Sequence, residues 1–177
     1  MNDLQKVTFA MNTAAQWHSW QRRKGLAQEP YVNHLIEVAD LVARLGGGDA
    51  EAVQAALLHD AIEDCNRTRE EIAGRFGDEV ADIVVELTDN KKLEKQTRKD
   101  LQVTNAPHKS PRASIIKLAD KTSNLRALVA SPPPWEVERK RTYVAWARSV
   151  VEGLPNKPPA LLAAFEAAAC EAEATFG

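Results

Sequence analysis

The residues with the clearest chemical potential follow directly on an apolar helical stretch. Residues 55–58 read Ala-Ala-Leu-Leu, and four polar side chains come next: His59, Asp60, Glu63 and Asp64. Side chains four apart share one face of a helix, so Glu63 and Asp64 are expected one turn below the His59-Asp60 pair. Carboxylates on an inward face are costly to bury without compensation. A bound divalent cation removes that cost, and histidine and aspartate are suitable ligands for it.

Two more polar residues interrupt apolar stripes elsewhere in the chain. His34 lies on the inward side of an expected helix, and Asp120 lies four residues after Ile116 in another. The predicted ligand set is His34, His59, Asp60 and Asp120. Two imidazoles and two carboxylates suit Mn²⁺, or a similar ion with open water positions, better than a closed structural zinc site. We expect one ion per chain, because His18 and His108 have no clear partners for a second site.

Each of these residues taken alone also has an ordinary structural interpretation. His34 suits a satisfied core histidine, and Asp120 suits an ion pair with a neighbouring lysine. Glu63 and Asp64 suit a solvated helix end, and a His-Asp dipeptide alone is a weak signal. The metal interpretation is favoured because four separate inward-facing polar groups then share one cause.

Helices are the elements that must position these residues. Alanine is abundant, and apolar residues recur at spacings of three and four rather than two. This pattern predicts an all-α bundle of about eight or nine helices. The first helix is expected to run on toward residues 22–24 and to carry an inward stripe of Leu4, Val7, Met11 and Ala14.

Start and stop signals delimit the later helices. Asp49 is a suitable N-cap, Thr68 and Glu71 have the spacing of a capping box, and Ser110 precedes a proline at a helix start. The expected helices after the first cover about residues 35–45, 50–64, 69–77, 80–87, 111–128, 143–150 and 158–175. The basic segment 90–99 is expected to be solvated.

The composition is that of an ordinary globular protein. The 177 residues are 44% hydrophobic and 27% charged, with a net charge of −2. These values favour a single domain over residues 1–177 and argue against disorder, nucleic-acid binding and a polybasic membrane binder. No segment approaches the length of a membrane span, residues 1–10 lack a signal-peptide core, and Cys65 and Cys170 form no disulfide or metal motif. The expected location is cytoplasmic.

The order and context of these residues resemble a known family. Ala-Ala-Leu-Leu-His-Asp-Ala-Ile-Glu-Asp at 55–64 and Lys-Leu-Ala-Asp-Lys-Thr-Ser-Asn-Leu-Arg at 117–126 resemble the HD-domain metal-dependent phosphohydrolases. Gln-Arg-Arg-Lys at 21–24 and Pro-Tyr-Val-Asn-His at 30–34 resemble more narrowly the hydrolase domain of RelA/SpoT-type proteins. The most similar group is the free-standing small alarmone hydrolases, which include the metazoan SpoT homologues. The resemblance covers about residues 10–154.

The resemblance implies an HD-type helical fold and a defined activity. That activity is Mn²⁺-dependent removal of pyrophosphate from the 3′ position of the alarmone (p)ppGpp, which yields GDP or GTP. The implied metal ligands are the four residues predicted above, and Glu63 and Asp64 match the pair that orients or deprotonates the attacking water. The implied substrate contacts are Arg23, Lys24, Lys95, Asn124 and Tyr143. No synthetase activity is expected, because the chain is too short to hold a second catalytic domain.

Three positions depart from the family pattern. Gly25 stands where an acidic residue is usual, Leu35 where proline is usual, and Thr122-Ser123 where a Leu-Tyr pair is common. Ser123 is expected to loosen the pocket for the base. Two other functions therefore remain open: an HD-type phosphatase acting on NADPH or a nucleoside monophosphate, and a non-catalytic alarmone sensor. The retained Glu63 and Asp64 argue against the sensor. The oligomeric state is also open, with a homodimer among the alternatives.

Overall fold

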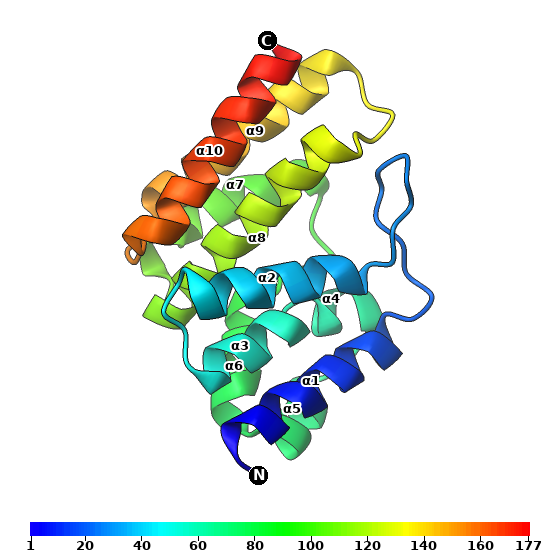
Figure 1. The fold of residues 1–177 in the computed structure, drawn as a ribbon, viewed down its shortest axis with the longest axis vertical. Coiled ribbons are helices and arrows are strands. Elements are labelled where there is room, and N and C mark those ends of the chain that lie inside the picture. Colours follow the sequence, from blue (N-terminus) through cyan, green and yellow to red (C-terminus); the bar gives the residue numbers. More distant parts are fainter.

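The protein is built from helices, as expected. The computed structural model describes residues 1–177 and contains ten α-helices, one 3₁₀ helix and no β-sheet (Figure 1). The α-helices are α1 Asp3–Trp17, α2 Val32–Arg44, α3 Ala50–Leu58, α4 Ala61–Cys65, α5 Arg69–Phe76, α6 Asp78–Leu87, α7 Lys95–Asn105, α8 Pro111–Ala130, α9 Val137–Gly153 and α10 Pro159–Phe176; the 3₁₀ helix is η1 Ala106–His108. None of these helices combines the length and the apolar character that a membrane span requires.

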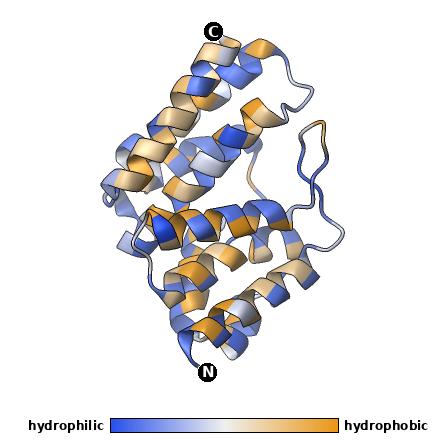
Figure 2. Cartoon of the chain, viewed as in Figure 1, coloured by the Kyte–Doolittle hydropathy of each residue, from blue (hydrophilic) through white to orange (hydrophobic).

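Helices α2 and α8 lie at the middle of the molecule and pack against each other (Figure 1). In that view α1, α3, α5 and α6 lie on the side of the N-terminus, while α9 and α10 lie on the side of the C-terminus. One cluster of 39 buried apolar residues extends from α1 to α10. Hydrophobic and hydrophilic residues alternate along the helices, as amphipathic packing requires (Figure 2).

The predicted helix caps are confirmed. Asp49 accepts a hydrogen bond from the backbone of Ala52 at 3.0 Å, at the start of α3. Thr68 and Glu71 form a reciprocal capping box at the start of α5. Ser110 caps α8, and proline occupies its first turn. These local bonds satisfy amide groups that have no partner within the helix.

The first helix is shorter than predicted, and only half of its predicted inward stripe is confirmed: Ala14 is buried, and Val7 packs against the core. The helix ends at Trp17, and residues 18–31 form a loop that holds one isolated β-bridge between Arg22 and Pro30. Leu4 and Met11 are exposed, whereas the buried residues of α1 are Ala10, Thr13, Ala14 and Trp17. The four buried residues face the neighbouring helices. The first turn of α1, which contains Leu4, extends beyond these helices.

The helix expected over 50–64 is interrupted at the residues with the most chemistry. Helix α3 ends at Leu58 and α4 starts at Ala61, because Asp60 leaves the helical region with φ −99° and ψ 2°. The chain therefore changes direction between His59 and Ala61. The sequence predicted that the polar side chains beyond Leu58 continue the apolar rows of α3. Because α3 ends at Leu58, they do not simply continue those rows.

The basic segment 90–99 is only partly a solvated loop. Its last five residues form the first turns of α7, where Lys95 is exposed but Arg98 and Lys99 are half-buried. Lys99 packs its ammonium over the ring of Trp146 at 4.9 Å. This cation–π contact attaches α7 to α9.

Two leucine variants test the assigned faces. Leu41 on α2 is 1% exposed, whereas Leu4 on α1 is 73% exposed. We expect Leu41→Ala to lower the free energy of unfolding by about 2–5 kcal/mol, because it leaves a cavity in the core. Leu4→Ala should change it by no more than about 0.5 kcal/mol. Urea denaturation followed by circular dichroism measures both, and equal effects would contradict the packing described here.

Candidate active site

Four side chains from three parts of the chain converge at the centre of the molecule. His34 comes from the first turn of α2, His59 and Asp60 from the turn between α3 and α4, and Asp120 from the middle of α8. The Nε2 atom of His34 lies 3.4 Å from Oδ1 of Asp120, and Nε2 of His59 lies 3.1 Å from Oδ2 of Asp60. All four predicted ligands thus meet, with their side chains at most 19% exposed.

The donor set fits a divalent cation. Nε2 of His59 is buried and has no hydrogen-bond partner, while Nδ1 of the same ring lies 2.7 Å from the carbonyl oxygen of Ala56. Donation from Nδ1 leaves a lone pair on Nε2, which is the state that binds a metal. One ligand atom from each of His34, His59 and Asp120 lies within 4.8 Å of the others. A cation among them would satisfy the orphaned nitrogen and offset the buried carboxylates.

The electrostatics of the cluster show why it needs positive charge. Burial lowers the pKa of His59, but the Asp60 and Asp120 carboxylates outweigh burial and raise it to about 9. Burial lowers the pKa of His34 despite the nearby Asp120. Although burial opposes ionisation of Asp60, the adjacent His59 holds the pKa of that carboxyl well below its usual range. Protons on the imidazoles and a bound cation are alternative ways to balance these carboxylates.

A second layer of hydrogen bonds holds the two carboxylates. The hydroxyl of Tyr31 donates to Oδ2 of Asp60 at 2.6 Å, and the side-chain amide of Asn124 donates to Oδ1 of Asp120 at 2.6 Å. Asn124 in turn accepts from the guanidinium of Arg23 at 3.1 Å. Of the predicted substrate contacts, Asn124 is therefore bonded directly to a predicted metal ligand, and Arg23 is linked to that ligand through Asn124.

The two acidic residues of α4 differ in how firmly they are held. Asp64 accepts from Gln21 at 2.7 Å and from Lys91 at 2.6 Å, one donor for each oxygen. Glu63 has only longer contacts, 3.4 Å to the backbone amide of Asp89 and 3.5 Å to Arg98. Burial, followed by repulsion from neighbouring carboxylates, raises the pKa of Glu63. Glu63 is thus the less firmly held of the pair.

A cleft of about 580 Å³ reaches the cluster at Asp60, the one predicted ligand in its lining. Its lining includes Asp60, Glu63 and Asp64 at one end, together with five cationic side chains: Arg22, Arg23, Lys24, Lys91 and Arg98. Tyr31, Trp135 and Tyr143 supply aromatic surface, and the rings of Trp135 and Tyr143 lie 5.8 Å apart. The cleft can therefore receive a ligand that combines several negative charges with a flat ring.

Most of the substrate contacts implied by the sequence line this cleft, and one does not. Arg23, Lys24, Asn124 and Tyr143 are in the lining, whereas Lys95 is outside it. Slight burial, followed by the charges of neighbouring cations that include Lys24 and Arg98, lowers the pKa of Lys95. Lys95 is therefore among cations, two of which line the cleft.

Sequence reasoning missed three residues of the site. Tyr31 and Gln21 hold Asp60 and Asp64, and both lie in segments that carried the family resemblance, although no role was assigned to them. Trp135 lines the cleft after a break of three prolines, and no pattern in the sequence indicated it. Such contacts depend on how distant segments meet.

The structure shows the surroundings of the positions that depart from the family pattern. Ser123 does not line the cleft, so the expectation that it loosens a base pocket is wrong; it is fully buried, with its hydroxyl 2.8 Å from Nδ1 of His34. A Cβ atom at Gly25 would lie 2.1 Å from the carbonyl oxygen of Ser131, so a larger residue does not fit there without a shift of the backbone. Leu35 is fully buried in the core.

Comparison with known proteins agrees with this geometry. The family model for the HD domain matches residues 10–147. This chain belongs to the HD-domain family. The HD-domain chain is 46% identical over 155 residues to the guanosine-3′,5′-bis(diphosphate) 3′-pyrophosphohydrolase MESH1 of Xenopus tropicalis, covering 86% of this chain and 87% of that protein. The human protein of the same name is 46% identical over 147 residues, covering 82% of each chain.

A solved structure shares the fold as well as the sequence. It is described as a metazoan orthologue of SpoT that hydrolyses ppGpp and plays a role in starvation responses. Its TM-score to the HD-domain chain is 0.88 at 41% identity, covering 92% of this chain and 93% of the other. The all-α fold and the resemblance to small alarmone hydrolases are thereby confirmed.

The predicted metal ligands can be tested without any substrate. We expect Asp60→Ala to lose bound divalent metal while keeping its helical content, because one of the four predicted ligands is removed. Metal analysis after dialysis and circular dichroism measure the two quantities. Asp40→Ala is the matched control, since Asp40 is an exposed aspartate of α2 that pairs with Arg44 and should leave the metal in place. Chelation should lower the melting temperature of the wild type but not of Asp60→Ala. Stoichiometric metal in Asp60→Ala would contradict the ligand assignment.

Proposed function

We propose that this HD-domain protein is a (p)ppGpp 3′-pyrophosphohydrolase that uses one Mn²⁺ per chain and has no synthetase activity. The observation that carries the proposal is the His34, His59, Asp60 and Asp120 cluster at one end of a cleft lined by cations. The names of the relatives support (p)ppGpp as the substrate. Proteins that match this chain over more than four-fifths of its length and of their own are called guanosine-3′,5′-bis(diphosphate) 3′-pyrophosphohydrolases. The ligand set supports Mn²⁺, since mixed imidazole and carboxylate ligands suit it.

The charge of the cleft matches the charge of this substrate. Guanosine tetra- and pentaphosphates carry several negative charges, which require cationic contacts for binding. Arg23, Lys24 and Lys95 are proposed to contact the phosphates, and Asn124 to contact the nucleotide beside them. The aromatic surface of Tyr143, next to Trp135, is proposed to receive the base.

The bond that breaks is the one between the 3′ oxygen of the ribose and its phosphorus. The oxygen of a water molecule ends on the released pyrophosphate, and the 3′ oxygen leaves with a proton on GDP or GTP. A divalent cation held by His34, His59, Asp60 and Asp120 would activate water and offset the charge of the phosphates. The residues of the chain supply orientation and proton transfer.

Glu63 is the better candidate for the proton acceptor. Its pKa is raised by burial, and its oxygens have only long contacts, so it is free to take a proton from water. Asp64 is bonded at both oxygens by Gln21 and Lys91, which suits a residue that orients rather than accepts. Arg98 pairs with Glu63 from the wall of the cleft and is close enough to contact the phosphates.

The activity has a direct test with purified protein. With ppGpp and Mn²⁺ we expect GDP and pyrophosphate in equal amounts, separated by anion-exchange chromatography. Parallel samples with NADPH and with nucleoside monophosphates should show much slower turnover. Release of orthophosphate from ppGpp, or faster turnover of NADPH, would instead favour the phosphatase function. Binding of ppGpp without turnover would favour a sensor.

A substitution at Glu63 tests the division of roles. We expect Glu63→Gln to lower kcat by about 10²- to 10⁴-fold, the usual contribution of a general base. Bound Mn²⁺ and the affinity for ppGpp should stay close to wild type, because Glu63 is not among the ligands. Glu51→Gln, at the far end of α3 from His59, is the matched control and should leave kcat unchanged. Near-normal kcat of Glu63→Gln at saturating ppGpp and Mn²⁺ would refute the assignment.

Replacement of a cation in the cleft should have a different signature. Lys24→Ala should mainly raise KM, if Lys24 contacts a phosphate equally in the ground and transition states. Steady-state kinetics over a range of ppGpp concentrations separate KM from kcat. Unchanged KM and kcat would remove Lys24 from the proposed binding residues.

A further inference from the structure

We infer that Ser123 and Glu37 are positioning residues for the metal ligand His34. They form a hydrogen-bonded chain that holds the imidazole with its proton on Nδ1 and its lone pair on Nε2. The inference rests on the metal site of the proposed function and extends it to two residues that lie outside the cleft.

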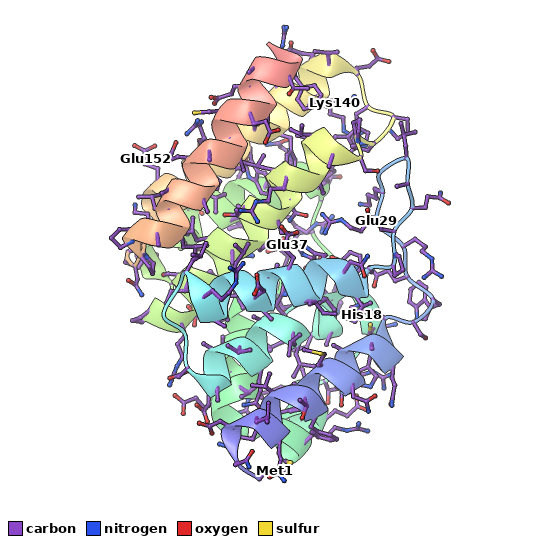
Figure 3. All side chains as sticks on the ribbon, in the orientation of Figure 1. Met1, His18, Glu29, Glu37, Lys140 and Glu152 are labelled. Carbon is purple, nitrogen blue, oxygen red and sulfur yellow. The ribbon has the colours of Figure 1, made fainter.

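The chain of contacts joins the two central helices. Nδ1 of His34 lies 2.8 Å from the hydroxyl of Ser123, and that hydroxyl lies 2.7 Å from Oε2 of Glu37. The other oxygen of Glu37 accepts from Arg126 at 3.0 Å. Glu37 follows His34 by one turn on α2, and Arg126 follows Ser123 by one turn on α8. Figure 3 labels Glu37, whose side chain comes from α2 where that helix passes α8.

The direction of these hydrogen bonds follows from the chemistry of the groups. An ionised carboxylate only accepts hydrogen bonds, so the hydroxyl of Ser123 must donate its one hydrogen to Glu37. The oxygen of Ser123 is then an acceptor toward His34, and Nδ1 of that ring must carry the proton. In the neutral ring Nε2 is left with a lone pair. Nε2 is the atom that lies 3.4 Å from Asp120, within the ligand cluster.

The neighbouring residue shows that this geometry is specific to Ser123. Thr122 is equally buried, and its hydroxyl bonds back to the carbonyl of Leu118 at 2.8 Å within α8. Ser123 instead directs its hydroxyl across to α2. Because Ser123 is fully buried, water cannot replace the bond if the hydroxyl is removed.

The two histidine ligands therefore obtain the same tautomer in different ways. His59 uses the carbonyl of Ala56, three residues earlier in its own chain segment. His34 depends on Ser123, which lies 89 residues away in the sequence. Substitution at Ser123 should thus act on one ligand only and leave His59 unchanged. Removal of such outer partners of a metal ligand commonly weakens metal binding by about 10- to 100-fold.

Titration of the metal-free, full-length protein with Mn²⁺ in a calorimeter tests the inference without any turnover. Ser123→Ala is expected to raise the dissociation constant for Mn²⁺ by about tenfold or more. Thr122→Val is the matched control, since it removes a buried hydroxyl from the adjacent position of α8 and should leave the constant unchanged. Glu37→Gln is the second variant, because its side chain is partly exposed and the fold should tolerate it. The amide of the introduced glutamine can donate to Ser123 and so reverse the direction of the hydrogen bonds between Glu37, Ser123 and His34. Mn²⁺ binding should therefore weaken.

Nitrogen NMR of the metal-free protein with labelled histidine gives a second readout. The wild type is expected to carry the proton of neutral His34 on Nδ1, and Ser123→Ala should shift the population toward the Nε2 tautomer. Wild-type Mn²⁺ affinity in both Ser123→Ala and Glu37→Gln would overturn the inference. An equal loss of affinity in Thr122→Val would also overturn it, because the effect would then come from general disturbance of α8.

Failure of this inference and failure of the proposed function are distinguishable. If the wild type binds Mn²⁺ and the variants weaken that binding, the inference holds even where ppGpp is not hydrolysed. If the wild type hydrolyses ppGpp and Ser123→Ala binds Mn²⁺ as tightly as the wild type, the inference is wrong and the proposed function holds.

Discussion

Two carboxylates and two imidazoles buried together are the constraint on which the rest of this structure depends. Asp60 and Asp120 lie within 4.0 Å of both His34 and His59, at the junction of α2, α8 and the α3–α4 turn. Buried carboxylates are tolerated only where positive charge and hydrogen bonds compensate them. The helices that form the core of the protein therefore also hold the four predicted metal ligands, and packing of α2 on α8 sets the distance between His34 and Asp120.

The ammonium of Lys121, the lysine nearest to Asp120, is held away from the position between the predicted ligands that a metal cation would occupy. Lys121 follows Asp120 on α8 and is buried, with its ammonium 3.3 Å from Oδ2 of Asp120. Gln102 accepts from that ammonium at 3.0 Å, and the ring of Trp146 lies 4.2 Å from it. These contacts hold Lys121 on the far oxygen of Asp120. The other oxygen, Oδ1, remains directed at the imidazoles and at Asn124.

The cations that line the cleft come from two segments of the chain. Arg22, Arg23 and Lys24 come from the loop after α1, and Lys91 and Arg98 come from the segment around the start of α7. The acidic residues of the lining come from α4 and the turn before it, except Glu29, which lies in the same loop as the first three cations. Pairing of Lys91 with Asp64 and of Arg98 with Glu63 places two of the cations beside the acidic residues of α4. A polyanionic substrate can thus be held by the walls while its reacting end lies over the ligand cluster.

The features that depend on neighbours along the chain could be predicted from residue type and spacing. The helical periodicity, the caps at Asp49, Thr68 and Ser110, and the inward polar residues His34 and Asp120 were all readable, because a helix places residues three and four apart on one face. The ligand set followed from the cost of burying those residues and from the family resemblance. Both depend on residue type and spacing alone.

The position of the break between α3 and α4, and the contacts between distant side chains, depend on how the helices pack together. The break at Asp60 separated α3 from α4, although the local pattern predicted one continuous helix. Ser123 was assigned to a base pocket, yet it contacts His34 from 89 residues away. Propensity and periodicity describe a single helix, whereas the rotation of one helix against another is set by packing of the whole core. Side-chain partners across helices are therefore not encoded in any local pattern.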